Sequence, residues 1–224
     1  MILLSDLLQQ AVETDTSVFL FINRMHNAFF DAFMSAFSGK WVWIPMYASI
    51  LYVMLRNFHW KITVLCVIGL ALTVAFADQA CATLIRPYVE RLRPSNPDNP
   101  LSDLVHIVNN RRGGRYGFPS CHAANTFGLA FYLFFLFRKR ALTLFIMTWA
   151  LITCYSRVYL GVHYPGDLLT GAVVGLAGAY IFYQLFVKTS SYKRTEPVVH
   201  VYAPVLIGGL TVAGMLIYAA IRVV

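Results

Sequence analysis

Three short clusters of polar residues carry the side chains that could do chemistry in this 224-residue chain. In the last cluster His163 precedes Asp167 by four residues, with Pro165 and Gly166 between them. A helix that starts there would let the Asp167 carboxylate reach back to the imidazole and fix its tautomer, leaving the other ring nitrogen free to attack phosphorus. Taken alone, the pair is equally well explained by Asp167 capping a helix. It is therefore a candidate nucleophile that must be weighed with the other clusters.

The middle cluster, Pro119-Ser120-Cys121-His122, opens a long apolar run. A proline near the first helical turn, followed by free backbone amides, forms a pocket in which the helix dipole favours an anion. Ser120 could hydrogen-bond the same oxyanion. The alternative is an ordinary serine N-cap beside an unrelated histidine. The presence of His122 favours the anion site.

The first cluster runs from Arg86 to Pro94 and contains three arginines. Arg86 and Arg93 are seven residues apart, close to two helical turns, so we expect both guanidinium groups on one helix face toward a single anion. Each offers planar, bidentate donors to phosphate oxygens. The alternative is that these side chains extend to lipid headgroups, and this fits Arg91 better.

Two histidines and an aspartate are also a conceivable metal site. Arg86, Arg93 and Arg157 argue against it, because clustered cations would repel a divalent metal and suit a phosphate transition state instead. The sequence contains no glycine-rich P-loop and no His-Glu-x-x-His pattern. We therefore expect a site that needs no metal and no other cofactor.

The composition indicates that membrane-spanning helices position these clusters. The chain is 58% hydrophobic and 12% charged, whereas a soluble domain carries about 25% charged residues. Its net charge of +8 comes from basic residues that stand between apolar runs. Anionic lipid headgroups and phosphate are therefore the expected partners, and nucleic acid is not. No feature predicts the oligomeric state.

The expected fold is all-α, an integral membrane bundle of six transmembrane helices, since each crossing needs about 20 apolar residues. The first span is short and requires Lys40 and Arg56 to extend toward the two interfaces. With these spans, all three clusters must lie at one membrane face. The six apolar runs are 40–56, 62–85, 118–137, 141–160, 168–187 and 201–221.

We expect one membrane domain over residues 1–224, with an interfacial segment at 1–38, the bundle at 39–224 and the catalytic clusters within 86–167. The stretch 15–37 is apolar on one side but carries charged residues, which is typical of an amphipathic helix in the interface. A seventh, polar span is the alternative. No removable signal peptide is expected at the N-terminus.

Together the three clusters resemble the signature of the type 2 phosphatidic acid phosphatase superfamily of membrane lipid phosphatases. That signature is Lys-x6-Arg-Pro, then Pro-Ser-Gly-His, then Ser-Arg-x5-His-x3-Asp, and the order and spacings match between Arg86 and Asp167. The resemblance implies that His163 forms a phosphohistidine, Asp167 orients it, and His122 protonates the leaving oxygen and later activates water. The phosphoryl oxygens would be bound by Arg86, Arg93, Ser120, Cys121 and Arg157.

Two positions depart from the family pattern. Arg86 stands where the family usually has lysine, which keeps the charge but brings a longer, planar head. Cys121 stands where it usually has glycine, so its backbone N–H remains available while its side chain must point away from the pocket. Neither change removes a group that does chemistry.

The resemblance implies a metal-independent phosphatase acting on a phosphomonoester or diphosphate of a cell-envelope lipid. Undecaprenyl diphosphate, lipid A, phosphatidylglycerophosphate and phosphatidic acid all remain open as substrates. A basic strip of Arg111, Arg112 and Arg115 could bind a second phosphate or a phosphorylated sugar. The alternative for this strip is simple attraction to anionic headgroups.

A different class of function is a lipid or ion transporter that uses Asp78 inside the second span. Asp78 is more simply a polar group bonded to a neighbouring helix.

Loop charges predict the orientation in the membrane. With the site arginines assigned to phosphate, the remaining basic residues place the loops after spans one, three and five in the cytoplasm. The predicted location is the bacterial inner membrane, with the active site on the periplasmic side. The basic residues of these three loops are Arg56, Lys61, Arg138, Lys139, Arg140, Lys188, Lys193 and Arg194.

Overall fold

The computed structural model describes residues 2–190, 192 and 198–223. Over these residues the only strand-like pairing is one isolated bridge between Leu92 and Tyr116, so the prediction of an all-α fold is confirmed. The α-helices are α1 Ile2–Asn23, α2 Ala28–Phe37, α3 Ile44–Asn57, α4 Trp60–Gln79, α5 Arg86–Val89, α6 Cys121–Phe137, α7 Arg140–Tyr159, α8 Pro165–Ser190 and α9 Ala203–Val223. The shorter elements are the 3-10 helices η1 Trp41–Trp43, η3 Ser102–Leu104 and η4 Val108–Asn110, and the π-helical segment η2 Ala80–Ile85.

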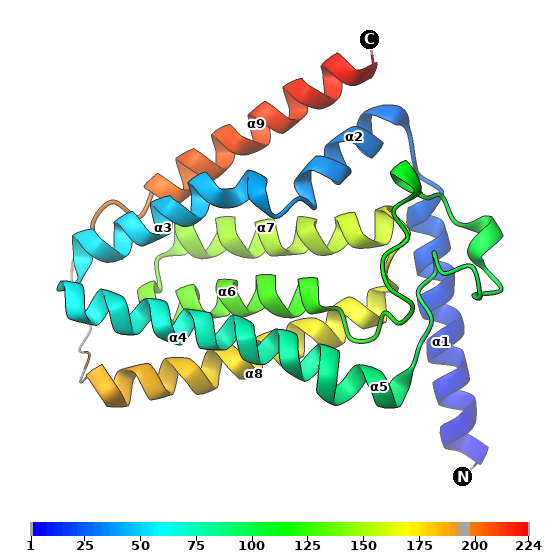
Figure 1. Cartoon of the computed structure of the whole chain (residues 1–224), viewed down its shortest axis with the longest axis horizontal. Helices are drawn as coiled ribbons and strands as arrows, with labels where there is room; N and C mark the ends of the chain where they lie inside the picture. The colour runs from blue at the N-terminus through cyan, green and yellow to red at the C-terminus, as the bar shows by residue number, and fades with distance from the viewer. Residues whose placement is uncertain (1, 191, 193–197, 224) are drawn as a thin grey trace.

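The centre of the molecule is a group of four helices, α4, α6, α7 and α8, which pack side by side (Figure 1). Helices α2 and α3 follow one another along α9 on one side of this group. Helix α1 lies across one end of the bundle, next to the long connection between α5 and α6 (Figure 1). This end also holds the start of α6, the end of α7 and the start of α8, so the elements that carry the three clusters meet there.

Four described helices are long and apolar enough to cross a membrane: Trp60–Val89, Arg140–Tyr159, Pro165–Ser190 and Ala203–Val223. The other two predicted spans correspond to shorter helices, since α3 has 14 residues and α6 has 17. The structure therefore supports a membrane protein built from apolar helices. The count of six crossings stays a prediction.

The N-terminal segment differs from the expected single helix over 15–37. Helix α1 ends at Asn23, and α2 begins after Asn27, whose side chain accepts a hydrogen bond from the Phe30 amide at 2.9 Å. This N-cap starts a new helix and turns the chain. Phe33 and Phe37 of α2 are buried in the main core, so residues 28–37 belong to the bundle.

The longest helix, Trp60–Val89, is widened to a π-helix over Ala80–Ile85. Pro87 lies two residues after this segment, and proline lacks an N–H and clashes with the carbonyl four residues earlier. A π-segment accommodates such a break without ending the helix. It carries the chain to Arg86 at the end of the bundle where the clusters meet.

Glycines bring α8 very close to α6. A Cβ on Gly171 would lie 2.4 Å from the Ser120 carbonyl oxygen, and one on Gly175 would lie 2.3 Å from that of Ala124. Only glycine permits this approach, because both obstacles are backbone atoms. This close contact between α6 and α8, the α6–α8 seam, therefore sets the distance between the start of α6, which carries His122, and the start of α8, which carries Asp167.

We expect Gly175→Ala to destabilise the protein by about 1–3 kcal/mol, because the added methyl group must push α8 away from α6. The matched control is Gly209→Ala on α9, where a Cβ would meet no heavy atom within 4 Å. Thermal unfolding in detergent compares the two variants. A Gly175→Ala protein that melts at the same temperature as Gly209→Ala would contradict the close seam.

Candidate active site

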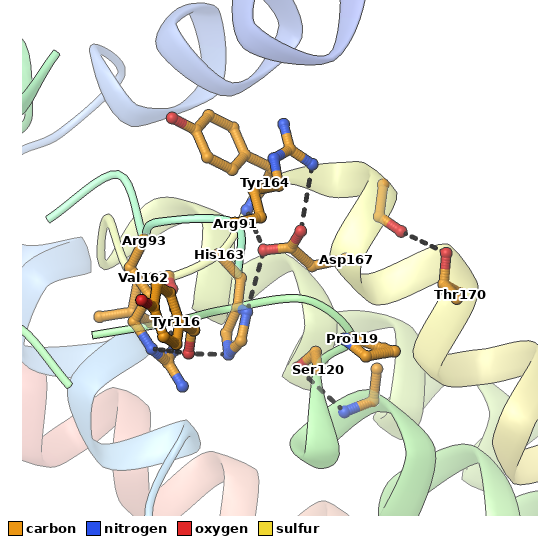
Figure 2. A network of polar contacts seen from close by, with 12 residues as sticks. Arg91, Arg93, Tyr116, Pro119, Ser120, Val162, His163, Tyr164, Asp167 and Thr170 are labelled. Atoms are coloured by element: carbon orange, nitrogen blue, oxygen red, sulfur yellow. Dashed lines mark hydrogen bonds and ion pairs between the residues drawn. The ribbon is translucent and has the colours of Figure 1, made fainter. Parts of the chain in front are cut away.

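His163 and Asp167 form a buried pair at the start of α8. The distance from His163 Nδ1 to Asp167 Oδ2 is 3.2 Å, and the two side chains are 1% and 0% exposed (Figure 2). Helix α8 begins at Pro165, so Asp167 lies in its first turn and faces back to the imidazole. The same carboxylate oxygen accepts a hydrogen bond from the Tyr164 amide at 3.1 Å. The Asp167 carboxylate therefore contacts the His163 imidazole, as the spacing of the two residues predicted.

Arg93 contacts the other ring nitrogen, since its Nη1 lies 2.8 Å from His163 Nε2. A guanidinium group can only donate, so Nε2 must be the unprotonated nitrogen and Nδ1 must carry the proton toward Asp167. Arg93 is itself held by backbone carbonyls, with Nε donating to Tyr116 O at 3.2 Å and Nη1 to Val162 O at 3.0 Å (Figure 2). This arrangement leaves Nε2 without a proton, as the predicted role of nucleophile requires.

Burial and nearby cations keep the imidazole neutral. Complete burial lowers the pKa of His163 well below its ordinary value, and the positive charges of Arg93, Arg157 and Arg86 lower it further. Burial, followed by the charge of Arg86, lowers the pKa of Arg93 to about 10. At neutral pH the histidine is therefore uncharged, as a nucleophile must be, while Arg93 remains a cation.

Arg86 reaches the site from the helix, but Arg93 does not. The helix ends at Val89, and Glu90 adopts the left-handed conformation with φ 48°, which turns the chain away. Arg93 then enters from the following loop, where its amide donates to the Arg115 carbonyl at 3.1 Å. The expectation that both guanidinium groups share one helix face is wrong.

The start of α6 is tied to the other two clusters through Ser120 and Cys121. The amide of the buried Ser120 donates to the Asp167 carbonyl at 2.9 Å, and its hydroxyl accepts from the Ala123 amide at 3.4 Å as an N-cap. Arg86 Nη2 donates to Pro119 O at 2.9 Å and to Cys121 Sγ at 3.1 Å. Because the Ser120 hydroxyl already caps the helix, its contact with phosphate stays a prediction.

A cavity of about 640 Å³ lies beside these clusters and is lined by His122 and Arg157. Arg157 Nη1 donates to the Ser38 hydroxyl at the corner between α2 and α3. The corner is fixed because the buried Trp43 donates its indole N–H to Phe37 O at 2.9 Å. None of the described lining residues is acidic, so the cavity suits an anion. The remaining lining residues are Ser35, Ser38, Gly39, Lys40, Trp41, Val108, Arg111, Gly113, Leu160 and Val162.

The structure separates the three arginines of the predicted basic strip. Arg111 lines the cavity. Arg112 donates instead to Ser95 O at 2.9 Å, and Arg115 forms an exposed ion pair with Asp98 at 3.6 Å. Arg111 is therefore the one arginine of this strip that lines the cavity.

Two residues whose side chains were expected to extend toward lipid instead lie at or beside the candidate active site. Lys40 lines the cavity beside His122. Arg91 bonds Asp167 Oδ1 at 3.1 Å and Asp15 Oδ2 at 2.7 Å. Their positions depend on contacts between segments far apart in the chain, and no local spacing signals such contacts.

Asp78, the residue proposed for a transporter, accepts a hydrogen bond from Asn125 of α6 at 3.3 Å. This matches the simpler reading of a polar group bonded to a neighbouring helix. The thiol of Cys121 also faces this part of the bundle, since its Sγ lies 3.9 Å from the Asp78 carbonyl oxygen.

Comparison with known proteins gives two kinds of match. Residues 63–191, more than half of the chain, match the model of the PAP2 superfamily. A lipid A 4'-phosphatase of Bacteroides thetaiotaomicron is 51% identical, and the match covers 94% of this chain and 97% of that protein. A lipid A 4'-phosphatase of Porphyromonas gingivalis is 31% identical, covering 82% of this chain and 78% of that protein.

A solved structure, the crystal structure of Aquifex aeolicus LpxE, superposes with a TM-score of 0.57. The match covers 75% of this chain and 94% of that one, and at 21% identity it supports the fold alone. The long, high-identity matches support the resemblance carried by the three clusters and favour a phosphatase over a transporter. The chain therefore belongs to the PAP2 superfamily and is a membrane lipid phosphatase.

Proposed function

We propose that this phosphatase hydrolyses a phosphate monoester of a lipid A-type substrate, a lipid whose headgroup is a phosphorylated sugar, and releases orthophosphate. A lipid A 4'-phosphatase that is 51% identical over 94% of this chain, and a second that is 31% identical, favour this substrate class over the prenyl diphosphates and simple phospholipids. The observation that supports this reaction is the buried His163–Asp167 pair. The Nε2 atom of His163 is the unprotonated ring nitrogen, and it lies among arginines.

In the first step His163 Nε2 attacks phosphorus and forms a P–N bond, while the bond from phosphorus to the leaving oxygen breaks. Asp167 accepts the hydrogen bond of Nδ1–H and stabilises the positive charge that develops on the ring. His122, which lines the cavity, protonates the leaving oxygen. Arg93 exchanges its contact with Nε2 for a phosphoryl oxygen, and Arg86 and Arg157 neutralise the remaining charge.

In the second step water attacks the phosphohistidine. His122 accepts a proton from this water, the P–N bond breaks, and orthophosphate leaves while Nε2 recovers its lone pair. Phosphoryl transfer depends mainly on positioning and charge neutralisation, which three guanidinium groups and the amides at the start of α6 supply. We therefore propose that the reaction requires no metal ion.

We also propose a placement in the inner membrane with the active site on the periplasmic side. Helices α2 and α3, joined by η1, would form one broken crossing, α6 a short one, and α1 would lie in the interface across the bundle end (Figure 1). The basic ends of α3, α6, α7 and α8 lie opposite the site, as expected for a cytoplasmic face. Lys193 and Arg194, which belong to the same argument, lie outside the described residues.

The central test is phosphate release from lipid A by the purified protein in detergent with EDTA present. We expect turnover in the wild type, and a loss of about 10³-fold or more in His163→Gln, because the nucleophile is absent. Radiolabelled substrate should leave a phosphoenzyme that is stable in alkali and labile in acid, as a phosphohistidine is.

His59→Gln, an exposed histidine at the other end of the bundle, is the matched control and should keep full activity. An acid-stable phosphoenzyme, or turnover that stops when metal is chelated, would contradict the proposed chemistry. Release of phosphate from undecaprenyl diphosphate but not from lipid A would contradict the substrate class.

The cavity indicates where the sugar of the substrate lies. An in-line displacement puts the leaving group opposite His163, on the side of His122, and His122 shares the cavity with Lys40 and Arg111. Neither of these two cations has an acidic partner in the part of the chain that the structure describes. They are therefore available to bind a second phosphate on the leaving group.

We expect Lys40→Ala to lower kcat/KM about 5- to 10-fold for lipid A with two phosphates, because one charged contact is lost. For lipid A that carries only the reacting phosphate, the change should stay within about twofold. The defect should shrink at high salt, since this site is exposed to solvent. Lys61→Ala at the far end of the bundle is the control, and an equal loss on both substrates would contradict a contact with the second phosphate.

A further inference from the structure

Arg91 lies between two carboxylates that come from distant parts of the sequence. Its Nη1 is 2.7 Å from Asp15 Oδ2 on α1 and 3.1 Å from Asp167 Oδ1 on α8. The three side chains are 22%, 14% and 0% exposed, so the contacts are largely shielded from water. Shielded ion pairs of this kind are screened less than surface pairs.

Further contacts fix the position of Arg91 and Asp15. The guanidinium carbon lies 3.8 Å from the centre of the Tyr164 ring, and the Arg91 carbonyl accepts from the Gly117 amide at 2.9 Å. Figure 2 shows the guanidinium between Tyr164 and Asp167. Asp15 Oδ1 accepts from the Gly166 amide at 2.7 Å, in the first turn of α8. Asp15 therefore binds both Arg91 and the helix that carries Asp167.

Asp167 uses its two oxygens for different purposes. Oδ2 bonds His163 and the Tyr164 amide, and Oδ1 bonds Arg91. A buried carboxylate without a counter-charge is strongly destabilised, and it takes up a proton or turns away. A carboxyl group that turned away would release the Nδ1–H of His163, and a protonated one would no longer stabilise positive charge on the ring. The charged or titratable groups that face Asp167 are Arg91 and Arg93 from the loop after α5, His163 and Tyr164 from the loop before α8, and Asp15 of α1 through Arg91.

We propose that Asp15 and Arg91 are positioning residues for the His163–Asp167 pair, so that α1 is a working part of the active site. The proposal rests on the proposed role of His163 as nucleophile. Arg91 is not among the residues that line the cavity, and it contacts the carboxylate on the oxygen that does not bond His163. It therefore acts through Asp167 and not on the substrate.

This role predicts a defect in turnover without a defect in binding. Partners that orient a functional side chain from behind typically contribute about 10- to 100-fold when removed. We expect Arg91→Gln to lower kcat by about 10- to 100-fold while KM changes less than about twofold. Arg91→Lys keeps the charge and should recover at least fivefold of the loss, as a purely substrate-binding, bidentate contact would not.

Asp15 should act through Arg91. We expect Asp15→Asn, which keeps an acceptor for the Gly166 amide but removes the charge, to lower kcat about 3- to 10-fold. The double variant Arg91→Gln/Asp15→Asn should be no worse than Arg91→Gln alone, because residues in one network are not additive. Asp6→Asn is the matched control, since Asp6 is an exposed acid on the same helix.

The experiment measures kcat and KM for lipid A in detergent, together with the melting temperature of each variant. An Arg91→Gln protein with raised KM and normal kcat would overturn the proposal, and so would multiplicative losses in the double variant. A loss that only follows a lowered melting temperature would overturn it as well, and Asp15→Asn answers the question if Arg91→Gln fails to fold. Wild-type protein that releases no phosphate would instead overturn the proposed function.

Discussion

The active site depends on one constraint, which is that a carboxylate and an imidazole are held together with almost no access to water. Asp167 and His163 are 0% and 1% exposed, so each needs its polar atoms satisfied by protein groups. Asp167 accepts hydrogen bonds from the Tyr164 amide, from Arg91 and from the N–H of the His163 ring. The second ring nitrogen of His163 accepts a hydrogen bond from Arg93. These contacts determine which ring nitrogen keeps its lone pair, and therefore which atom would attack phosphorus in the reaction that we propose.

The arrangement of helices follows from the same constraint. The start of α6 must approach the start of α8 closely enough for the Ser120 amide to reach the Asp167 carbonyl at 2.9 Å, and the glycines of α8 allow it. Bulkier side chains along this seam would separate His122 from the His163–Asp167 pair. The apolar length of the helices is what a membrane protein requires, whereas the small residues of α8 determine the geometry of the site.

The sequence predicted the parts of the site that depend on short spacings. His163 and Asp167 are four residues apart at the start of a helix. This spacing was enough to predict the contact between the two side chains, which the structure contains. Arg93 was placed on a helix by the same reasoning, but the helix ends at Val89 because Glu90 adopts a left-handed conformation. Asp15 was not predicted, because its contact with Arg91 joins two segments that are 76 residues apart in the sequence, and no local pattern indicates that these segments meet.

The arginines of the site divide into two groups according to their partners. Arg86 and Arg93 donate mainly to backbone carbonyls, which orient a guanidinium without cancelling its charge, so the charge remains available to a phosphate. Arg91 bonds two carboxylates, and its charge is already used within the protein. Similar residues within one short segment therefore differ in their partners. In the reaction that we propose, the cations with neutral partners bind the substrate, and the one with acidic partners holds the group that orients the nucleophile. By the same reasoning we propose that Lys40 and Arg111, which line the cavity without acidic partners among the described residues, bind the substrate.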